Sequence, residues 1–360
     1  MSRITIRPAW TFVSDSGEKV DPQLFGLLAA IHDLGKLTLA AKQVKLSYRY
    51  AWALLGKWER FFGGPLVVKE RGRGATLAPL GAKLLWAEQR SDANLFPQLE
   101  NIASELNLEI NRALQSAQQP VLRLHASHGY AVEKLPPLMR LHGHATLDLK
   151  YMGSVAAVTS LARNGCELAG FHVPFGEQAA NLWREYAKWL KPRKHGIIRL
   201  VTRTQGLMVP KGNPLRIAAL ADLQRSGLRF VNRQRDSGTR LLLDGLLARQ
   251  SLDARRIQGY DSGEFTHAAV AAFVASGMAD VGLGVEPAAR QFKLDFIPVI
   301  KERYMLACSL ERLRHAAIRE LIALVQGPEF REMVRPEAGY ALDHPGKLEK
   351  VQPSMRWLGE

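Results

Sequence analysis

The chain has 360 residues, of which 47 % are hydrophobic and 23 % are charged, and it carries a net charge of +15. This length suffices for two or three domains with cores of their own, and the composition is that of a globular protein. The two cysteines argue against a disulfide framework, and no apolar run approaches the length of a transmembrane helix. The first residues, MSRITIRPAWTF, lack the apolar segment of a signal peptide, so we expect a cytoplasmic protein.

The positive charge is denser toward the N-terminus. Residues 1–90 contain 14 Lys and Arg against 7 Asp and Glu, which is +7 of the total of +15. A basic excess of this kind suits contacts to DNA phosphates. Elsewhere the excess is diffuse, with one local cluster at Lys191, Arg193, Lys194 and Arg199. That cluster either contacts DNA or an anion or is a solvated surface.

The first ninety residues combine helical and β patterns. Residues 3–13 alternate and begin with β-branched side chains, which predicts a strand. Apolar residues at helical spacing from Leu24 to Ile31 predict a helix that ends near Gly35. Two more helices and two short strands are expected at Leu37–Gln43, Tyr48–Phe62, Leu66–Glu70 and Ala75–Leu77. The order is therefore helix, helix-turn-helix and β-hairpin.

The third of these helices has the features of a DNA-recognition helix. Ser47 is a suitable N-cap, and side chains that form hydrogen bonds occupy the first turn, which such helices present to base edges. The basic tip of the hairpin can reach the DNA backbone or minor groove. The alternative is a small helical bundle with a solvated basic loop. The candidate DNA-binding residues are Thr38, Lys42, Ser47, Tyr48, Arg49, Tyr50, Lys57, Lys69, Arg71 and Arg73.

A long helical pattern follows the hairpin. Pro79 begins a helix that Pro97 should interrupt or restart. From Leu99 to Ala117, apolar residues recur at spacings of three and four. An isolated amphipathic helix needs a partner for its apolar face. We therefore expect residues 91–119 to form a linker helix that dimerises, or alternatively to pack against their own domain.

From Val121 the pattern changes to alternating strands and helices, which predicts an α/β domain with a mostly parallel sheet. Residues 127–129 should open the first of these helices. Small polar residues follow several strands, where hydroxyls and helix N-termini can donate hydrogen bonds to an anion. Each such position is also an ordinary helix cap. The candidate ligand-binding residues are Ser127, His128, Gly129, Ser154, Val155, His172, Arg203, Arg235, Ser237, Gly238, Thr239, Thr266 and His267.

The run GKLTLAAKQVKLSYRYAWALL, followed by GGPLVVKERGRGATLAPLGAKLL, resembles the winged helix of LysR-type regulators, and more closely its ModE-type variant. The similarity covers about residues 20–90. It implies a winged helix-turn-helix DNA-binding domain at 1–90 that binds a two-fold related operator as a dimer or a tetramer. The glycine cluster of the wing is shorter here than in many ModE-type proteins, so the wing contact can differ.

The second half resembles type II periplasmic-binding-protein domains, specifically the molybdate-binding-like effector module fused to ModE-type winged helices. The stretches that carry this resemblance are LAGFHVP, FVNRQRDSGTRLLLDGLL, EFTHAAVAAFVASG and ADVGLGVEPAA. It implies a two-lobed α/β ligand-sensing domain over residues 120–345, followed by a tail at 346–360. Lobe 1 would comprise about 120–200 and 303–345, and lobe 2 about 201–302. Hinges are expected near residues 203–205 and 301–304.

Together these features predict a one-component transcription regulator with operator DNA, a small anionic effector and a second copy of itself as partners. The resemblance implies an oxyanion, molybdate or tungstate first, and control of molybdenum-related genes. Formate or another small carboxylate is the alternative effector. A constitutive architectural DNA-binding protein is the alternative function.

Enzymatic motifs are missing from the sequence. Ser237 lies in DSG rather than G-x-S-x-G, and no P-loop or G-x-G-x-x-G follows a predicted strand. The histidine pairs His125/His128 and His142/His144 have no Cys or carboxylate at metal-ligand spacing. We therefore expect neither catalytic residues nor a metal, a cofactor or a membrane partner.

Overall fold

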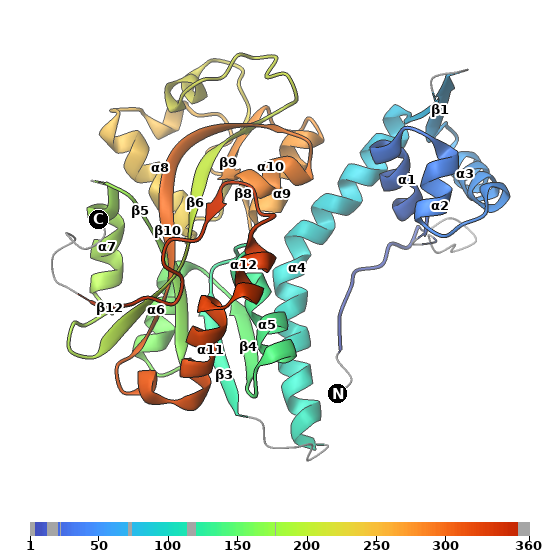
Figure 1. Cartoon of the computed structure of the whole chain (residues 1–360). Helices are drawn as coiled ribbons and strands as arrows, with labels where there is room; N and C mark the ends of the chain where they lie inside the picture. Colours follow the sequence, from blue (N-terminus) through green and yellow to red (C-terminus); the bar gives the residue numbers. More distant parts are fainter. Residues whose placement is uncertain are drawn as a thin grey trace. The chain divides into compact units, whose positions relative to one another are not determined.

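The computed structural model describes residues 4–12, 21, 23–70, 74–113, 120–176 and 178–351. The chain divides into two compact units (Figure 1). The N-terminal unit comprises residues 7–95, and the C-terminal unit comprises residues 1–6 and 96–360. None of the described helices combines the length and the apolar character needed to span a membrane.

The N-terminal unit contains three short helices and a two-stranded hairpin, as predicted. These elements are α1 (Gln23–Leu34), α2 (Leu37–Gln43), α3 (Tyr48–Phe62), β1 (Val67–Glu70) and β2 (Gly74–Leu77). The Ser47 side chain caps α3 by accepting a hydrogen bond from the Tyr50 N–H. The core gathers Leu24, Leu28, Ile31, Leu55 and Trp58 from the facing sides of α1 and α3. The apolar spacing in the sequence therefore becomes one buried cluster.

The hairpin is held against the helices by backbone contacts. The Glu59 carboxylate accepts hydrogen bonds from the N–H groups of Leu66 (2.9 Å) and Val67 (3.3 Å). At the other strand, the Ala75 N–H donates to the Gly35 carbonyl at 2.8 Å. A Cβ at Gly81 would lie 2.1 Å from the Leu66 carbonyl oxygen, so this close approach requires glycine.

Two predictions for this region were wrong. Residues 4–12 form no regular strand: only a single bridge residue occurs, at Thr11. Trp10 and Phe12 instead use their side chains to pack on the core of the N-terminal unit. Residues 3 and 13 of the predicted strand lie outside the described part of the chain.

The predicted break at Pro97 is also absent. Helix α4 runs from Pro79 to Ala113 with Pro97 inside it. Proline removes a backbone hydrogen bond and costs a helix about 3 kcal/mol. The helix continues because it is anchored by buried residues on both sides, such as Leu85 and Ala103, and because the proline itself is buried. The boundary between the two units falls just before this proline, at residues 95 and 96.

The C-terminal unit is built on one curled sheet with the strand order β4-β3-β5-β10-β6-β9-β7-β8, and β11 and β12 also pair with β6. Its strands are β3 (Val121–Ala126), β4 (Thr146–Tyr151), β5 (Leu168–Pro174), β6 (His195–Val209), β7 (Phe230–Arg233), β8 (Gly263–Glu264), β9 (Val281–Val285), β10 (Asp295–Ser309), β11 (Tyr340–Ala341) and β12 (Leu348–Lys350). The sheet is mixed rather than mostly parallel, because β6 and β10 pair antiparallel along their whole length. The chain leaves one lobe along β6 and returns along β10, so these strands must run in opposite directions.

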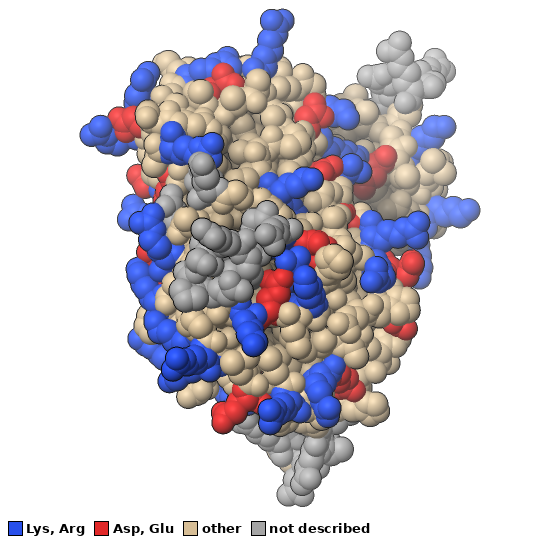
Figure 2. Space-filling view, turned by 60° about the vertical axis from the view of Figure 1, so that its left-hand side comes forward, with Lys and Arg blue, Asp and Glu red and all other residues tan. Residues whose placement is uncertain are grey.

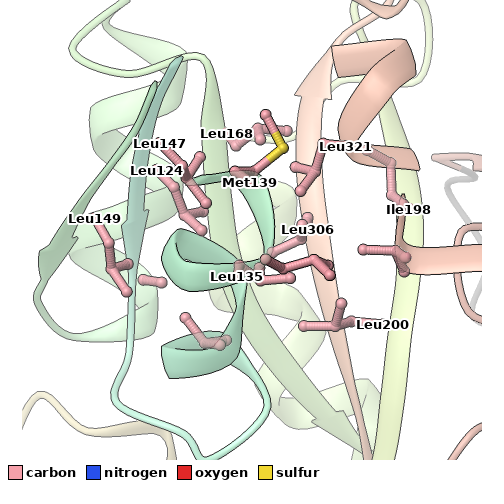
Figure 3. Close-up of a cluster of buried hydrophobic side chains, with 14 of the residues drawn as sticks. Leu124, Leu135, Met139, Leu147, Leu149, Leu168, Ile198, Leu200, Leu306 and Leu321 are labelled. Atoms are coloured by element: carbon pink, nitrogen blue, oxygen red, sulfur yellow. The ribbon is translucent and has the colours of Figure 1, made fainter. Parts of the chain in front are cut away.

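Helices cover the sheet in two lobes (Figure 1). The first lobe carries α5 (Leu135–His142), α6 (Ser154–Ala162), α7 (Gln178–Ala187), α11 (Ala316–Gln326) and α12 (Pro328–Val334). The second lobe carries α8 (Gly238–Arg249), α9 (His267–Ala275) and α10 (Glu286–Gln291). The sequence did not predict α7 or α10. One core of the first lobe packs α5 and α11 on the strands, through Leu124, Met139, Leu306 and Leu321 among others (Figure 3).

Two further expectations for this unit need correction. Residues 127–129 do not open a helix: a short 3-10 turn at Val132–Lys134 precedes α5, which begins at Leu135. Arg199 does not belong to a surface cluster, because it is buried and forms ion pairs with Asp343 (3.2 Å) and Glu349 (2.5 Å).

A pair of helical glycines tests the packing of the hairpin. Gly81→Ala should destabilise the N-terminal unit by about 1–3 kcal/mol, since its Cβ would overlap the Leu66 carbonyl oxygen. Gly56→Ala in α3 is the matched control, because the nearest atom to its Cβ is a flexible Arg60 side-chain nitrogen at 3.6 Å. That control should be stabilised by about 0.5–1 kcal/mol through lower backbone entropy. Urea denaturation measures both, and equal effects of the two substitutions would contradict the packing described here.

Candidate functional site

A cluster of buried polar side chains lies where β6 and β10 cross between the lobes. Arg203 on β6 and Glu302 on β10 are register partners, with 1 % and 0 % of their surface exposed. The Arg203 Nε donates to Glu302 Oε1 at 2.5 Å. Gln205 Nε2 donates to the same oxygen at 2.9 Å and to Thr239 Oγ1 at 3.0 Å. The crossing point therefore holds a buried ion pair, and Gln205 links its carboxylate to Thr239 in the second lobe.

The first lobe adds hydroxyl and imidazole groups. His172 on β5 places its Nδ1 at 3.5 Å from Ser127 Oγ and at 3.4 Å from Ser154 Oγ. Its Nε2 lies 3.8 Å from Glu302 Oε2, which is too long for a hydrogen bond. The Tyr304 hydroxyl donates to the Ser127 carbonyl at 2.7 Å and so fixes the loop that follows β3.

The second lobe contributes the starts of two helices and the end of a strand. Ser237 caps α8 through a hydrogen bond from the Arg240 N–H, and Thr266 caps α9 through one from the Ala269 N–H. Arg233, the last residue of β7, is 3 % exposed. Its guanidinium donates to the carbonyls of residues 264 (3.2 Å) and 265 (2.7 Å).

The two lobes touch at glycines. A Cβ at Gly238 would lie 2.2 Å from His172 Nε2, and a Cβ at Gly153 would lie 2.7 Å from the Asp236 carbonyl oxygen. Each contact joins a residue of one lobe to a residue of the other. Only glycine allows so close an approach at these two positions.

Burial and the two arginines determine the charges in this cluster. Burial lowers the pKa of His172 to about 4, and Arg203 adds to this effect against the opposing Glu302. Burial, Arg233 and Arg203 lower the pKa of His128 to about 3. Burial and the same two arginines also bring the pKa of His267 well below its usual value. These three histidines are therefore neutral near pH 7, where neutral imidazoles can donate one hydrogen bond each.

The arginines also influence one another. Burial, followed by the nearby Arg203, lowers the pKa of Arg233 to about 9. Burial raises the pKa of Glu302, but the charge of Arg203 and the hydrogen bonds from Arg203 and Gln205 outweigh it, so the pKa of this carboxyl is lowered. The cluster thus contains two guanidinium groups and the Glu302 carboxylate around neutral histidines.

Most of the predicted ligand-binding residues come together here. The buried members are Ser127, His128, Ser154, His172, Arg203, Ser237, Gly238, Thr239, Thr266 and His267. Gly129 lies beside them, since a Cβ there would be 3.2 Å from Arg203 Nη1. Val155 packs against the core of α6 and α7. Arg235 lies in the turn after β7 with 83 % of its side chain exposed, and it pairs with Asp261 at 3.2 Å.

Sequence reasoning missed four members of the cluster: Gln205, Arg233, Glu302 and Tyr304. A signal was present for two of them. Gln205 and Glu302 lie in short polar runs, TRTQ and KER, which interrupt the apolar stretches of β6 and β10. No such signal distinguished Arg233 from Arg235, because the two lie two positions apart and carry the same guanidinium group.

The predicted DNA-binding residues that can be located lie on the surface of the N-terminal unit. Thr38, Lys42, Ser47, Arg49 and Lys57 are exposed. Tyr48 and Tyr50 are 48 % and 46 % exposed, and the Tyr50 hydroxyl donates to Asp21 at 3.3 Å. The side chain of Lys69 and the residues Arg71 and Arg73 lie outside the part of the chain that the structure describes. On the face shown in Figure 2, Lys and Arg side chains are scattered rather than gathered in one patch.

The neutral histidines predict a specific dependence of stability on pH. The folded-state pKa of His172 (about 4) lies below its unfolded value of about 6.5, so the unfolded chain binds more protons as the pH falls between these values. Stability that is present above pH 6.5 is therefore lost toward pH 4, by up to about 1.4 kcal/mol per pH unit for this group. Burial raises the pKa values of Glu88 and Glu133 to about 7, and these groups act in the opposite sense, so only a difference between variants isolates the histidine.

Between about pH 6 and pH 5, His172→Gln should lose less unfolding free energy than the unmodified protein, by about 1 kcal/mol. Urea titrations at both pH values measure this difference. His142→Gln is the control, because the His142 side chain is exposed, and it should follow the unmodified protein. Parallel pH profiles for all three proteins would show that His172 is not held neutral.

Comparisons with known proteins match this architecture. Residues 136–326 match the family model described as PBP superfamily domain. YvgK of Bacillus subtilis, an uncharacterised protein, is 34 % identical over 155 residues, which cover 43 % of this chain and 50 % of YvgK. An uncharacterised protein from the 5′ region of a ferredoxin 2Fe-2S gene of Clostridium pasteurianum is 35 % identical over 109 residues, 30 % of this chain and 96 % of its own length. The molybdenum-pterin-binding protein MopB of Rhodobacter capsulatus is 30 % identical over 120 residues, 32 % of this chain and 43 % of MopB.

The chain thus spans about half the length of YvgK and less than half of MopB. Among solved structures, a cysteine-to-serine mutant of OxyR from Corynebacterium glutamicum, bound to hydrogen peroxide, aligns with a TM-score of 0.45 and 14 % identity, over 89 % of this chain and 95 % of that one. Full-length BenM aligns with a TM-score of 0.42 and 15 % identity, over 88 % and 97 %. Within the described residues, no group of three His, Cys, Asp or Glu side chains is placed to hold a metal ion. The family match covers more than half of the chain and includes both lobes, and the chain therefore belongs to the PBP superfamily.

Proposed function

We propose that this protein is a one-component transcription regulator. Its N-terminal unit binds operator DNA, and its two-lobed domain binds a small anion that alters DNA binding. The observation that carries the proposal is the pair of buried arginines, Arg203 and Arg233, with neutral histidines at the junction of the lobes. A ligand at this junction contacts both lobes and so favours one arrangement of them.

The DNA-binding half of the proposal rests on the N-terminal unit. The first turn of α3 exposes Tyr48, Arg49 and Tyr50 on a helix capped by Ser47. A short antiparallel hairpin follows, and the region as a whole is basic. An exposed polar helix start of this kind suits base edges in the major groove, and basic side chains suit the phosphates.

The anion-binding half rests on charge and hydrogen bonding. Among the described residues, no carboxylate lies within ion-pair distance of Arg233, and Arg203 has one nitrogen, Nη1, without a hydrogen-bond partner. His267 Nδ1 is likewise unpartnered in this part of the chain. Buried cations need a counter-charge, and an anion between the lobes would supply it. Hydroxyls of Ser127 and Ser154 stand on the facing side of the cluster.

The similarity to MopB makes molybdate or tungstate one candidate for the anion. Formate or another small carboxylate is the alternative, because the same donors would hold a carboxylate group. The effector would act on an assembly, since Ile102, Leu106 and Ile110 leave an apolar stripe of α4 exposed and a second copy of the chain would cover it. The stripe residues Leu114 and Ala117 lie outside the described residues.

Arg49→Ala tests the DNA-binding unit. If Arg49 contacts a base with two hydrogen bonds, the variant should bind its selected DNA site more weakly by about 1–3 kcal/mol and with relaxed base preference at one position. Arg60→Ala, at the exposed far end of α3, is the control and should keep the base preference. The site is first selected from a random DNA library, and affinities are measured by fluorescence anisotropy at fixed salt. Identical base preferences for Arg49→Ala and the unmodified protein would remove α3 as the recognition helix.

Arg233→Gln tests the anion site. Molybdate, tungstate or formate at about a hundredfold excess over its dissociation constant should stabilise the unmodified protein by about 2.7 kcal/mol, and this stabilisation should disappear in Arg233→Gln. Arg235→Gln removes the same charge from an exposed side chain two residues further along the chain. This variant should retain the response. Thermal unfolding with and without each anion is the measurement. If no small anion stabilises the unmodified protein, a constitutive DNA-binding protein becomes the better hypothesis.

A further inference from the structure

The buried cluster contains acceptors as well as donors. Gln205 Oε1 and Glu302 Oε2 belong to residues with 0 % exposure, and neither oxygen has a hydrogen-bond partner within the described chain. Leaving a buried polar atom without a hydrogen-bond partner destabilises the folded protein. Two such oxygens beside an unpartnered arginine nitrogen mark a place where a ligand completes the hydrogen bonding.

The acceptor role of Gln205 Oε1 is fixed by its own amide nitrogen. That nitrogen donates to Glu302 Oε1 and to Thr239 Oγ1. A carboxylate oxygen can only accept, so the amide cannot be turned around without placing two acceptors together. The oxygen of Gln205 must therefore face away from Glu302 and requires a donor.

The second acceptor is equally constrained. Glu302 Oε1 already receives hydrogen bonds from Arg203 and Gln205. Its other oxygen, Oε2, faces His172 Nε2 across 3.8 Å, too far for a hydrogen bond, and both atoms are without a partner among the described residues. The Arg203 and Glu302 charges balance, which leaves the charge of Arg233 for the ligand. The cluster thus offers a guanidinium group for which no ion pair is seen among the described residues, together with acceptors that need a hydrogen-bond donor.

An anion without protons meets only half of these requirements. Molybdate, tungstate, sulfate and formate at neutral pH have only acceptor oxygens, which suit the arginines and the imidazole N–H groups. Their oxygens would be repelled by Glu302 Oε2 and Gln205 Oε1. A site built to receive a hydrogen bond from its ligand rejects analogues that lack the donor far more strongly than it rejects a change in size.

On the premise that the cluster is the effector site proposed above, we infer that the effector is a small anion that carries its own O–H or N–H donor. Glu302 or Gln205 would accept a hydrogen bond from that donor, while Arg203 and Arg233 would bind the anionic oxygens. Hydrogenphosphate and hydroxycarboxylates belong to this class. They rank above molybdate, tungstate and formate as candidates.

Matched pairs of anions test the inference on the unmodified full-length protein. Phosphate and sulfate share a tetrahedral shape, but only phosphate keeps a proton near neutral pH. Glycolate and acetate differ by one hydroxyl group. Calorimetric titration should give at least about tenfold tighter binding for the donor-bearing member of a pair, and tighter binding than for molybdate. Equal or tighter binding of sulfate, acetate or molybdate would overturn the inference while leaving the anion-sensing function intact, whereas no binding of any anion would overturn both.

Glu302→Gln supplies a second test, because an amide can donate where the carboxylate could only accept. The preference for the donor-bearing anion should shrink or reverse in this variant, and an unchanged preference would overturn the role of Glu302. Glu185→Gln, at a side chain that is 42 % exposed, is the control and should keep the preference. Circular dichroism establishes that the variant is folded, and if Glu302→Gln does not fold, the comparison of matched anions on the unmodified protein still decides the question.

Discussion

The ion pair between Arg203 and Glu302 is the interaction on which the arrangement of the two lobes depends. It joins the two strands that pass between the lobes, at the point where both are fully buried. Loss of one partner of a buried pair leaves an uncompensated charge and typically destabilises a protein by about 3–5 kcal/mol. Gln205 is oriented by the same carboxylate and reaches Thr239 in the second lobe. The pair therefore positions polar groups of both lobes at once.

The cluster around this pair explains why so many ionisable side chains are tolerated in one core. The histidines avoid the cost of burying charge by remaining neutral, as their lowered pKa values indicate. The hydroxyls of Ser237 and Thr266 satisfy the first N–H groups of α8 and α9. Several buried atoms without a partner among the described residues, including Arg203 Nη1 and Gln205 Oε1, lie at the lobe junction, where Gly153 and Gly238 bring the lobes together. This combination suits a ligand that both lobes hold.

Helix α4 provides the covalent link from this site to the N-terminal unit. Its second half is fixed to the first lobe: the Asn101 side chain exchanges two hydrogen bonds with the Tyr151 backbone, at 2.7 and 3.0 Å, and Glu105 pairs with Lys150 at 2.7 Å. A pocket of about 600 Å³ lies along the same contact, and Phe96 and Tyr151 line it. The His128 ring lies 5.3 Å from the Tyr151 ring. Packed side chains thus connect the polar cluster with the part of α4 that begins just after the unit boundary.

The local elements of this protein were determined by the sequence itself. The helices at 37–43 and 48–62, the Ser47 cap and the hairpin were predicted because apolar spacing, capping residues and glycines act over a few residues. Small polar residues after the strands predicted Ser127, Ser154, Ser237, Thr239 and Thr266, and the structure places these side chains in the buried polar cluster. The resemblance of the second half predicted the two lobes before any contact was known.

Only the tertiary structure decided which residues of that site meet. Arg203 and Glu302 are 99 positions apart in the chain, and nothing local pairs them. Whether Arg233 or Arg235 enters the core depends on where β7 ends, and the structure buries the first and exposes the second. The continuation of α4 through Pro97 likewise depends on packing partners that are distant in sequence. The same is true of the antiparallel pairing of β6 with β10. Long-range burial outweighs local preference at these positions, because the free energy of packing exceeds the cost of a single unfavourable residue.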